Sequence, residues 1–179
     1  MKGPNVLLRP LRVEDADREY CAWMNDPAVI CHLEARFQTW DLASLREWVE
    51  AERKRRYLWA ITLHSEMLVH IGNITLGPVN WRHQHADISL MIGRKDKWRK
   101  GYASEALNLV VVYAFNTLGL RKLTASIMEG NGASLALFYK AGFRKEGILR
   151  KQRWCEGEWQ NEVVLGLLVN EQVAKATEG

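Results

Sequence analysis

The sequence is poor in the residues that define small specialised folds. It has three cysteines, Cys21, Cys31 and Cys155, and no C-x-x-C pair. An odd number of cysteines without metal-ligand spacing argues against a disulfide scaffold or a zinc site and fits a reducing compartment. No repeat, low-complexity segment or domain break interrupts the 179 residues, of which 47% are hydrophobic. We therefore expect a single globular domain, residues 1–179, with a substantial core.

Long apolar runs and strong charge are also missing. The longest uncharged apolar run, around residues 106–115, is too short to span a bilayer. No apolar segment follows Met1-Lys2-Gly3-Pro4, so we expect no signal peptide and no membrane association, and a cytoplasmic protein. The net charge is only +4. The one dense basic run, Arg53-Lys54-Arg55-Arg56, ends a predicted helix and complements its dipole; the alternative, nucleic-acid binding, is not expected.

The common phosphate motifs G-x-x-x-x-G-K-[ST] and G-x-G-x-x-G are absent, but a basic glycine turn is present. It comprises Trp98, Arg99, Lys100 and Gly101, and continues into Tyr102-Ala103. A strand is predicted before it, over 86–92, and the apolar spacing over 103–118 predicts a helix after it. Free amide groups at a helix start, the helix dipole and nearby cations bind phosphate groups. The alternative is that Arg99 and Lys100 are ordinary solvated loop residues.

The remaining periodicity predicts an α/β (α+β) sandwich with mixed strands and helices on both faces of a sheet. The expected elements are strand 6–12, helices 13–25 and 41–55, strands 57–63, 68–76 and 86–92, helix 103–118, strand 122–128, helix 132–141 and two closing strands. Asp41 is a candidate cap for helix 41–55. His64-Ser65-Glu66-Met67 is expected to connect a hairpin.

The basic turn resembles the acetyl-CoA pyrophosphate loop of the GNAT (GCN-five-related) N-acetyltransferases, Arg/Gln-x-x-Gly-x-Gly/Ala. Here it is Trp98-x-x-Gly101-x-Ala103, and its aromatic opening is similar to the RimJ/RimL-type branch. Three further segments are similar in order and spacing: 6–16, Asn131-Gly132-Ala133-Ser134 with its following Gly142-Phe143 turn, and a closing hairpin and strand at 155–168. The resemblance implies a GNAT fold with a mixed, mostly antiparallel sheet flanked by helices on both faces. It also implies an acetyl-CoA-dependent N-acetyltransferase whose loop residues 98–103 bind the cofactor.

Direct transfer requires a neutral amine, a donor for the oxyanion and stabilisation of the leaving thiolate. Asp87 is the leading candidate for the base, because it lies on the strand that the resemblance places beside the thioester; its alternative is an outward-facing polar residue. His83 and His85 are further candidates if the strand continues. As a metal pair these two histidines lack a third ligand nearby, and no metal is expected. The resemblance implies the backbone N–H of Met91 or Ile92 as the oxyanion donor.

The thiolate position departs from a common family pattern. Phe138 occupies the place of the usual tyrosine, and Tyr139 is turned about 100° further round the helix. The resemblance to RimJ/RimL-type enzymes implies Ser134 near the sulfur as the replacement and Asn131 on the pantetheine arm. Both residue types also cap helices, which is the alternative for each.

The acceptor is the least defined part. Residues 25–38 form a polar segment that in the resembled family borders the acceptor site, so Glu34 and Arg36 are candidates to bind the substrate, or are ordinary surface charges. We expect a small-molecule amine such as an amino sugar. The alternatives are a protein N-terminus, as in ribosomal-protein acetyltransferases, and a non-catalytic CoA-binding module. A polyamine would call for an acidic cleft, which this basic chain does not indicate. The eight tryptophans suggest an acceptor pocket or a homodimer contact.

Overall fold

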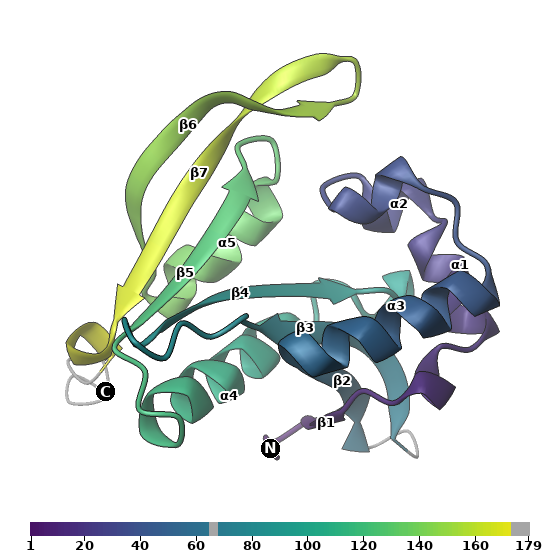
Figure 1. Ribbon diagram of the computed structural model, residues 1–179, viewed down its shortest axis with the longest axis horizontal. Coiled ribbons are helices and arrows are strands. Elements are labelled where there is room, and N and C mark those ends of the chain that lie inside the picture. The colour runs from purple at the N-terminus through teal and green to yellow at the C-terminus, as the bar shows by residue number, and fades with distance from the viewer. Residues whose placement is uncertain (65–67, 173–179) are drawn as a thin grey trace.

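The computed structural model describes residues 1–64 and 68–172. These residues form a seven-stranded sheet in the order β1-β2-β3-β4-β5-β7-β6 (Figure 1). The strands are β1 Val6–Pro10, β2 Tyr57–Leu63, β3 Val69–Leu76, β4 His85–Ile92, β5 Lys122–Met128, β6 Arg144–Cys155 and β7 Glu158–Leu168. Neighbouring strands are antiparallel except β4 and β5, which are parallel. The predicted mixed, mostly antiparallel sheet is confirmed.

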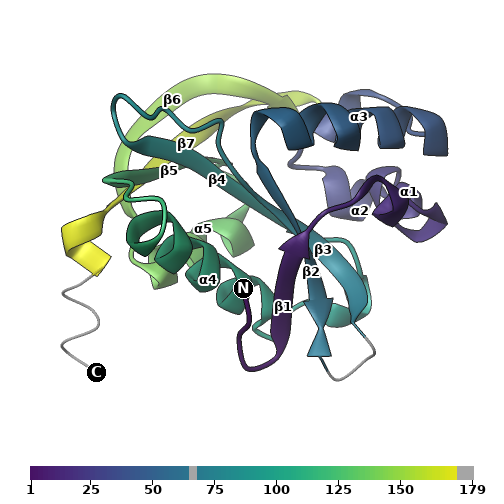
Figure 2. The same ribbon diagram turned by 60° about the horizontal axis from the view of Figure 1, so that its bottom comes forward.

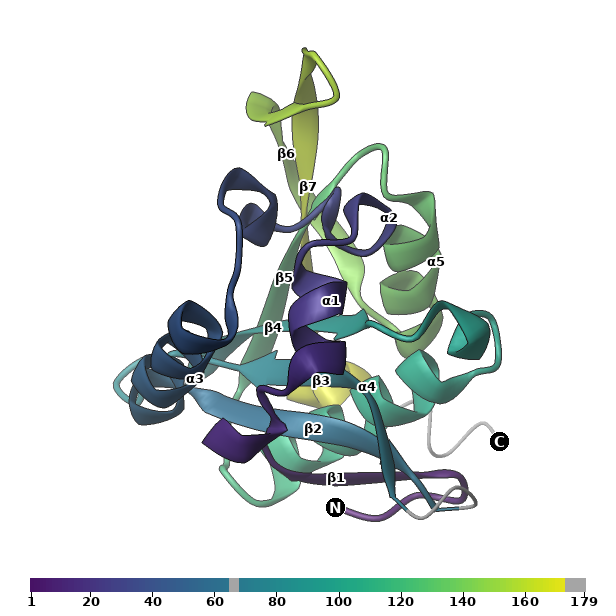
Figure 3. The ribbon, with the colours of Figure 1, turned by 90° about the vertical axis from the view of Figure 1, so that its right-hand side faces the viewer.

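Helices cover both faces of this sheet (Figure 3). The helices are α1 Arg18–Met24, α2 Pro27–Ile30, α3 Leu42–Arg55, α4 Tyr102–Asn116 and α5 Gly132–Ala141, with 3₁₀ turns η1 Val13–Asp15, η2 Glu34–Phe37 and η4 Lys95–Lys97. The predicted apolar stripe of α4 is buried and packs with α5 on one face, while α1 and α3 pack on the other. Strand β2 serves both cores, since Ile61 faces the α4 side and Ala60 the α1–α3 side.

Strands β4 and β5 diverge, and Figure 2 shows how strands β5, β7 and β6 turn away from strands β1, β2 and β3. They pair only between His85–Asp87 and Lys122–Thr124. Beyond this point β5 continues to pair with β7 on its other side as far as Met128, and β4 continues to pair with β3 as far as Ile92. Beyond Asp87 and Thr124, the edges of β4 and β5 that face each other therefore lack a strand partner within the described residues.

The main difference from the expected elements is the segment 13–25. It is not one helix, because η1 ends and α1 begins only after Asp17, whose carboxylate accepts a hydrogen bond from the Tyr20 N–H (2.9 Å). An aspartate at this position is a strong N-cap and so starts a new helix. The capping role of Asp41 is confirmed. The predicted elements from β1 to α5 otherwise agree within two residues, whereas the last strand, expected over 163–168, begins five residues earlier as β7. Residues 65–67 of the predicted hairpin connection lie outside the described part.

In residues 1–64 and 68–172, no helix is both long and apolar enough to cross a membrane. The thiols of Cys21, Cys31 and Cys155 are free.

Candidate active site

A cavity of about 500 Å³ lies where β4 and β5 diverge. Its walls come from β3 and β4 on one side and from β5, β7 and α5 on the other, and it is covered by residues 32–35, Gln38 and Arg153 of β6. Aromatic side chains of α1, α3 and α5 supply part of the apolar lining: Tyr20, Trp48 and Phe138. The site is thus assembled from segments far apart in the sequence.

The edge of β4 presents free backbone donors to this cavity. At one end of the β3–β4 pair, the Asp87 carbonyl accepts from the Gly77 N–H (2.8 Å), and at the other the Gly93 N–H donates to the Ile71 carbonyl (2.9 Å). Both Asp87 and Gly93 therefore direct their backbone groups toward β3. Because the direction of these groups alternates along a strand, Met91 also bonds toward β3, whereas Leu90 and Ile92 point their N–H groups toward β5. Of the two predicted oxyanion donors, this geometry favours Ile92 and assigns Met91 to the sheet.

The predicted phosphate-binding turn forms the start of α4. Gly101 is the N-cap residue with φ of +84°, and the next two residues, Tyr102 and Ala103, open the helix with free N–H groups. Apart from Gly101 and its chain neighbours, no atom of the described residues lies within 4 Å of where a Gly101 Cβ would stand. Arg99 and Lys100 are exposed, and neither forms an ion pair within the part of the chain described. The turn can therefore admit an anion and offers it cationic side chains.

Trp98 joins this turn to the end of β4. Its indole Nε1–H donates to the Ile92 carbonyl at 2.7 Å. The strand end is also closely packed, because a Cβ at Gly93 would overlap the Trp23 ring and one at Gly72 would overlap the Met91 carbonyl. The backbone that carries the Ile92 N–H is therefore held rigidly next to the turn.

Helix α5 brings three predicted residues to the cavity: Asn131, Ser134 and Phe138. Asn131 is the N-cap, and its Oδ1 accepts from the Ser134 N–H at 3.1 Å. The cap uses only this oxygen of Asn131. Within the described residues, neither the Asn131 amide NH₂ nor the Ser134 hydroxyl makes a hydrogen bond. Phe138 is 2% exposed and packs on Phe143, whereas Tyr139 is 45% exposed and lies outside the cavity lining, as the helix rotation predicts.

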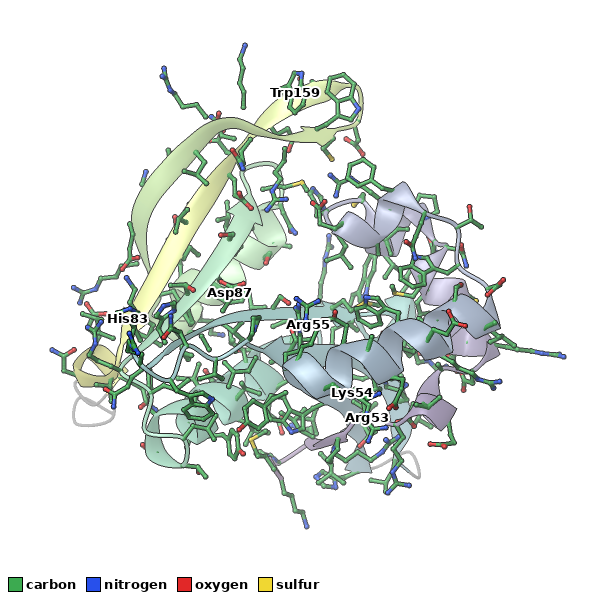
Figure 4. The ribbon with its side chains drawn as sticks, in the orientation of Figure 1. Arg53, Lys54, Arg55, His83, Asp87 and Trp159 are labelled. Atoms are coloured by element: carbon green, nitrogen blue, oxygen red, sulfur yellow. The ribbon has the colours of Figure 1, made fainter. Side chains whose placement is uncertain are left out.

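Asp87 lies at the closed end of the divergence, where β4 and β5 are still paired (Figure 4). Its Oδ1 accepts from the Thr124 hydroxyl at 2.9 Å, and partial burial raises the pKa of Asp87 above its ordinary value. It is on the predicted strand but is not among the residues that line the cavity. His83 and His85 stack 6.4 Å apart, and they too are outside the lining. Among the described residues, no group of three or more His, Cys, Asp or Glu could hold a metal ion.

Sequence reasoning missed a buried carboxylate in the cavity, Glu162 of β7. It is 4% exposed, and its Oε1 accepts from the Arg153 Nε and Nη2 at 2.9 and 2.7 Å. Its Oε2 has no hydrogen-bond partner within the described residues. The sequence does hold a signal for it, since Glu162 directly precedes the apolar run Val163–Leu168 of a strand.

The two predicted acceptor residues have different surroundings. Glu34 lines the cavity and accepts from Arg153 at 3.0 Å. Arg36 does not line it: its guanidinium donates to the carbonyls of Leu33 (2.6 Å) and Trp154 (2.8 Å). Arg36 therefore ties the 34–37 turn to the β6–β7 hairpin, and the expectation that it grips the acceptor directly is not supported by its contacts.

Comparison with known proteins agrees with this geometry. The acetyltransferase (GNAT) domain family matches residues 5–144. The chain is 31% identical to the uncharacterized N-acetyltransferase YoaA of Bacillus subtilis over 160 residues, which cover 88% of this chain and 89% of YoaA. It is 30% identical to the probable N-acetyltransferase YjcK of the same organism over 182 residues, covering 94% and 96%. Spermidine N-acetyltransferase from Vibrio cholerae, solved in complex with CoA and spermine, has the same fold, with a TM-score of 0.84 at 20% identity, covering 96% of this chain and 99% of that one.

Proposed function

The chain belongs to the GNAT family of acetyltransferases and is an N-acetyltransferase, and from this premise we propose that it transfers the acetyl group of acetyl-CoA directly to the primary amine of a small molecule such as an amino sugar. The observation that carries the proposal is the free edge of β4, which leads from the cavity to the open, basic turn at Gly101. An extended ligand with amide groups can pair with such an edge as an added strand would.

The residues present fit acetyl-CoA along this path. Arg99, Lys100 and the amide groups that open α4 would bind its pyrophosphate. The Asn131 amide NH₂ would bind the pantetheine arm from the opposite wall. When bound, the cosubstrate supplies a thioester carbonyl that an amine can attack.

Three groups of the chain then have distinct roles in the proposed transfer. The Ile92 N–H donates to the oxygen that becomes negatively charged in the tetrahedral intermediate. The Ser134 hydroxyl donates to the departing sulfur. The Oε2 of Glu162 accepts the proton that the acceptor ammonium must lose, because Glu162 is the buried carboxylate of the cavity and this oxygen has no partner within the described residues. Asp87, the base expected from the sequence, is retained as the alternative and would act through water from the closed end.

The shape and charge of the cavity support a small acceptor over a peptide. Arg36 binds the Trp154 carbonyl and Arg153 binds Glu34, so the 34–37 turn and the β6–β7 hairpin meet over the cavity. Arg153 also pairs with Glu162, and Arg56 is a second arginine of the lining, so the cavity holds two cations and two carboxylates and no excess of acid. A polycation such as spermine would instead favour an excess of acid. A RimJ/RimL-like enzyme for protein N-termini is the second candidate, supported by the aromatic Trp98 that opens the cofactor turn.

Two further expectations belong to this proposal. The free thiols are compatible with a cytoplasmic enzyme. A homodimer is proposed on the exposed tryptophans of the β6–β7 hairpin, Trp154 and Trp159, whose rings lie 5.3 Å apart.

The test is acetyl-CoA-dependent thiol release across amino sugars, nucleotide-linked amino sugars, polyamines, aminoglycosides and N-terminal peptides, with mass spectrometry of the products. We expect release that depends on a small amine. Release with peptides alone would support the RimJ/RimL-like alternative. Saturable CoA binding without release on any acceptor would support a non-catalytic CoA-binding module and contradict the proposal.

A further inference from the structure

Asn73 of β3 is a buried polar residue whose hydrogen bonds are incomplete. It lines the cavity and is 4% exposed, and its Nδ2 has no partner within the described part of the chain. Leaving a buried donor without a partner is costly, so native structures seldom do so without a reason. A ligand in the cavity would supply the missing acceptor.

The orientation of the Asn73 amide is fixed by a neighbour. His70 Nε2 lies 2.9 Å from the Asn73 Oδ1 and 2.9 Å from the Gly72 carbonyl. A carbonyl oxygen can only accept, so Nε2 must carry the hydrogen and must face the amide oxygen of Asn73 rather than its NH₂ group. His70 itself is held between the rings of Tyr20 and Trp23, at centroid distances of 5.6 and 5.0 Å. The NH₂ group of Asn73 is therefore the group that stays free.

Further hydrogen-bonding groups lie on the same face of the sheet. Asn73 is opposite Met91, and two residues along β3 Thr75 is opposite Ser89, so their side chains share one face, about 7 Å apart. The Thr75 and Ser89 hydroxyl groups lie 2.7 Å apart, and both residues line the cavity. The floor of the cavity on this side is thus a row of an amide donor and two hydroxyl groups, without a free carboxylate.

We propose that Asn73 is a specificity-determining residue of the acceptor site, whose amide donates to an oxygen atom carried next to the acceptor amine. The inference rests on the proposed function and refines it. It assigns the acceptor to hydroxylated amines, in which a hydroxyl or ring oxygen neighbours the amine, and rejects oxygen-free polyamines. A site built to bond a substrate oxygen discriminates strongly against an analogue that lacks it, because the analogue leaves the buried donor unpaired.

The experiment compares matched acceptors in matched variants. The acceptors are 2-aminocyclohexanol against cyclohexylamine, which differ by one hydroxyl, and glucosamine against spermidine. For each pair we take the kcat/KM of the hydroxylated amine divided by that of the oxygen-free amine. This ratio is measured for the wild type, for Asn73→Ala and for the control Asn108→Ala, which changes an exposed asparagine of α4. Intrinsic differences in amine basicity cancel when the ratio is compared between variants.

We expect Asn73→Ala to reduce each ratio about tenfold to a hundredfold, and Asn108→Ala to leave it unchanged. The near-isosteric Asn73→Asp, which keeps an oxygen toward His70 but removes the donor, should shift the preference toward spermidine. CoA titration and thermal melting of each variant check the fold, and Asn73→Asp decides if Asn73→Ala does not fold.

Unchanged ratios in a folded Asn73 variant would overturn the inference, as would a wild type that prefers spermidine to glucosamine. Either result leaves acetyltransfer itself intact. Absence of product with every amine would instead overturn the proposed function.

Discussion

Replacing Gly101 with alanine tests whether the turn before α4 admits a pyrophosphate. Gly101 is exposed and has φ of +84°, and no described residue other than its chain neighbours has an atom within 4 Å of the position of a Cβ. An alanine there meets no side chain of the described residues beyond its chain neighbours, so its steric effect on them is limited to the left-handed backbone. A bound phosphate close to the backbone would meet the new methyl group.

The backbone effect can be measured separately, because the same helix is followed by a second glycine of this kind. Gly119 is exposed and has φ of +67°, and again no atom of the described residues, chain neighbours aside, lies within 4 Å of a Cβ there. Each alanine should lower the free energy of unfolding by about 1–2 kcal/mol, the penalty of the left-handed conformation. Only Gly101→Ala should weaken CoA binding, and losing one charge-assisted hydrogen bond to the pyrophosphate raises Kd about 10- to 100-fold.

The assay is calorimetric titration of both variants with CoA, together with transfer rates from acetyl-CoA and from acetylpantetheine, which lacks the pyrophosphate. The Gly101→Ala defect should be present with acetyl-CoA and absent with acetylpantetheine. Equal Kd values for the two variants, or an equal defect with both donors, would refute the assignment of the turn to the pyrophosphate.

Three further changes test other parts of the structure. Glu162→Gln should lower kcat/KM about 10²- to 10⁴-fold without changing the Kd of CoA; an unchanged pH–rate profile would exclude Glu162 as the base. Asp15→Asn removes the negative charge and one of the two oxygens that accept from Arg9 (2.6 and 2.7 Å) and should cost about 1–3 kcal/mol at pH 7 in urea unfolding. Although burial raises it, the pKa of Asp15 is brought below its ordinary 3.8 by Arg9 and a backbone amide, so the deficit is full above that pH and disappears as the pH falls through the folded-state pKa; a deficit independent of pH would contradict this. Gly93→Ala should lower stability by about 1–3 kcal/mol through overlap with the Trp23 ring, and unchanged thermal melting would contradict that packing.

Local patterns were sufficient to predict most elements. Strand 122–128 and helix 132–141 have the predicted bounds, because apolar periodicity and flanking glycine and asparagine residues mark both ends. The same patterns failed at 13–25, where the capping carboxylate of Asp17 overrides a continuous helical spacing. Capping of this kind depends on the side-chain geometry of one residue, which periodicity does not report.

The candidate site was predicted less completely, since its key contacts join distant segments. Arg153 binds Glu34 across 119 residues, and Arg36 binds Trp154 across 118. No local pattern encodes such pairs, so Arg36 was expected in the acceptor site although its guanidinium holds two backbone carbonyls, and Glu162 was not considered. The residues from the cofactor motif, Asn131 and Ser134, were predicted because their spacing within one helix start is a local property.

Strand β4 explains why side-chain patterns locate the site but do not describe its chemistry. One face of β4 packs Ala86 and Ile88 into the α4 core, the other directs Ser89 and Met91 to the cavity, and Ile88 borders the cavity as well. Its remaining edge carries the Ile92 N–H, which no side-chain pattern can reveal, because a backbone donor exists at every such position and becomes functional only where the neighbouring strand departs. That departure depends on how far β4 and β5 pair, which is set by the whole sheet. The apolar periodicity of β4 therefore predicts the strand, but the unpaired Ile92 N–H results from the departure of β5 from β4.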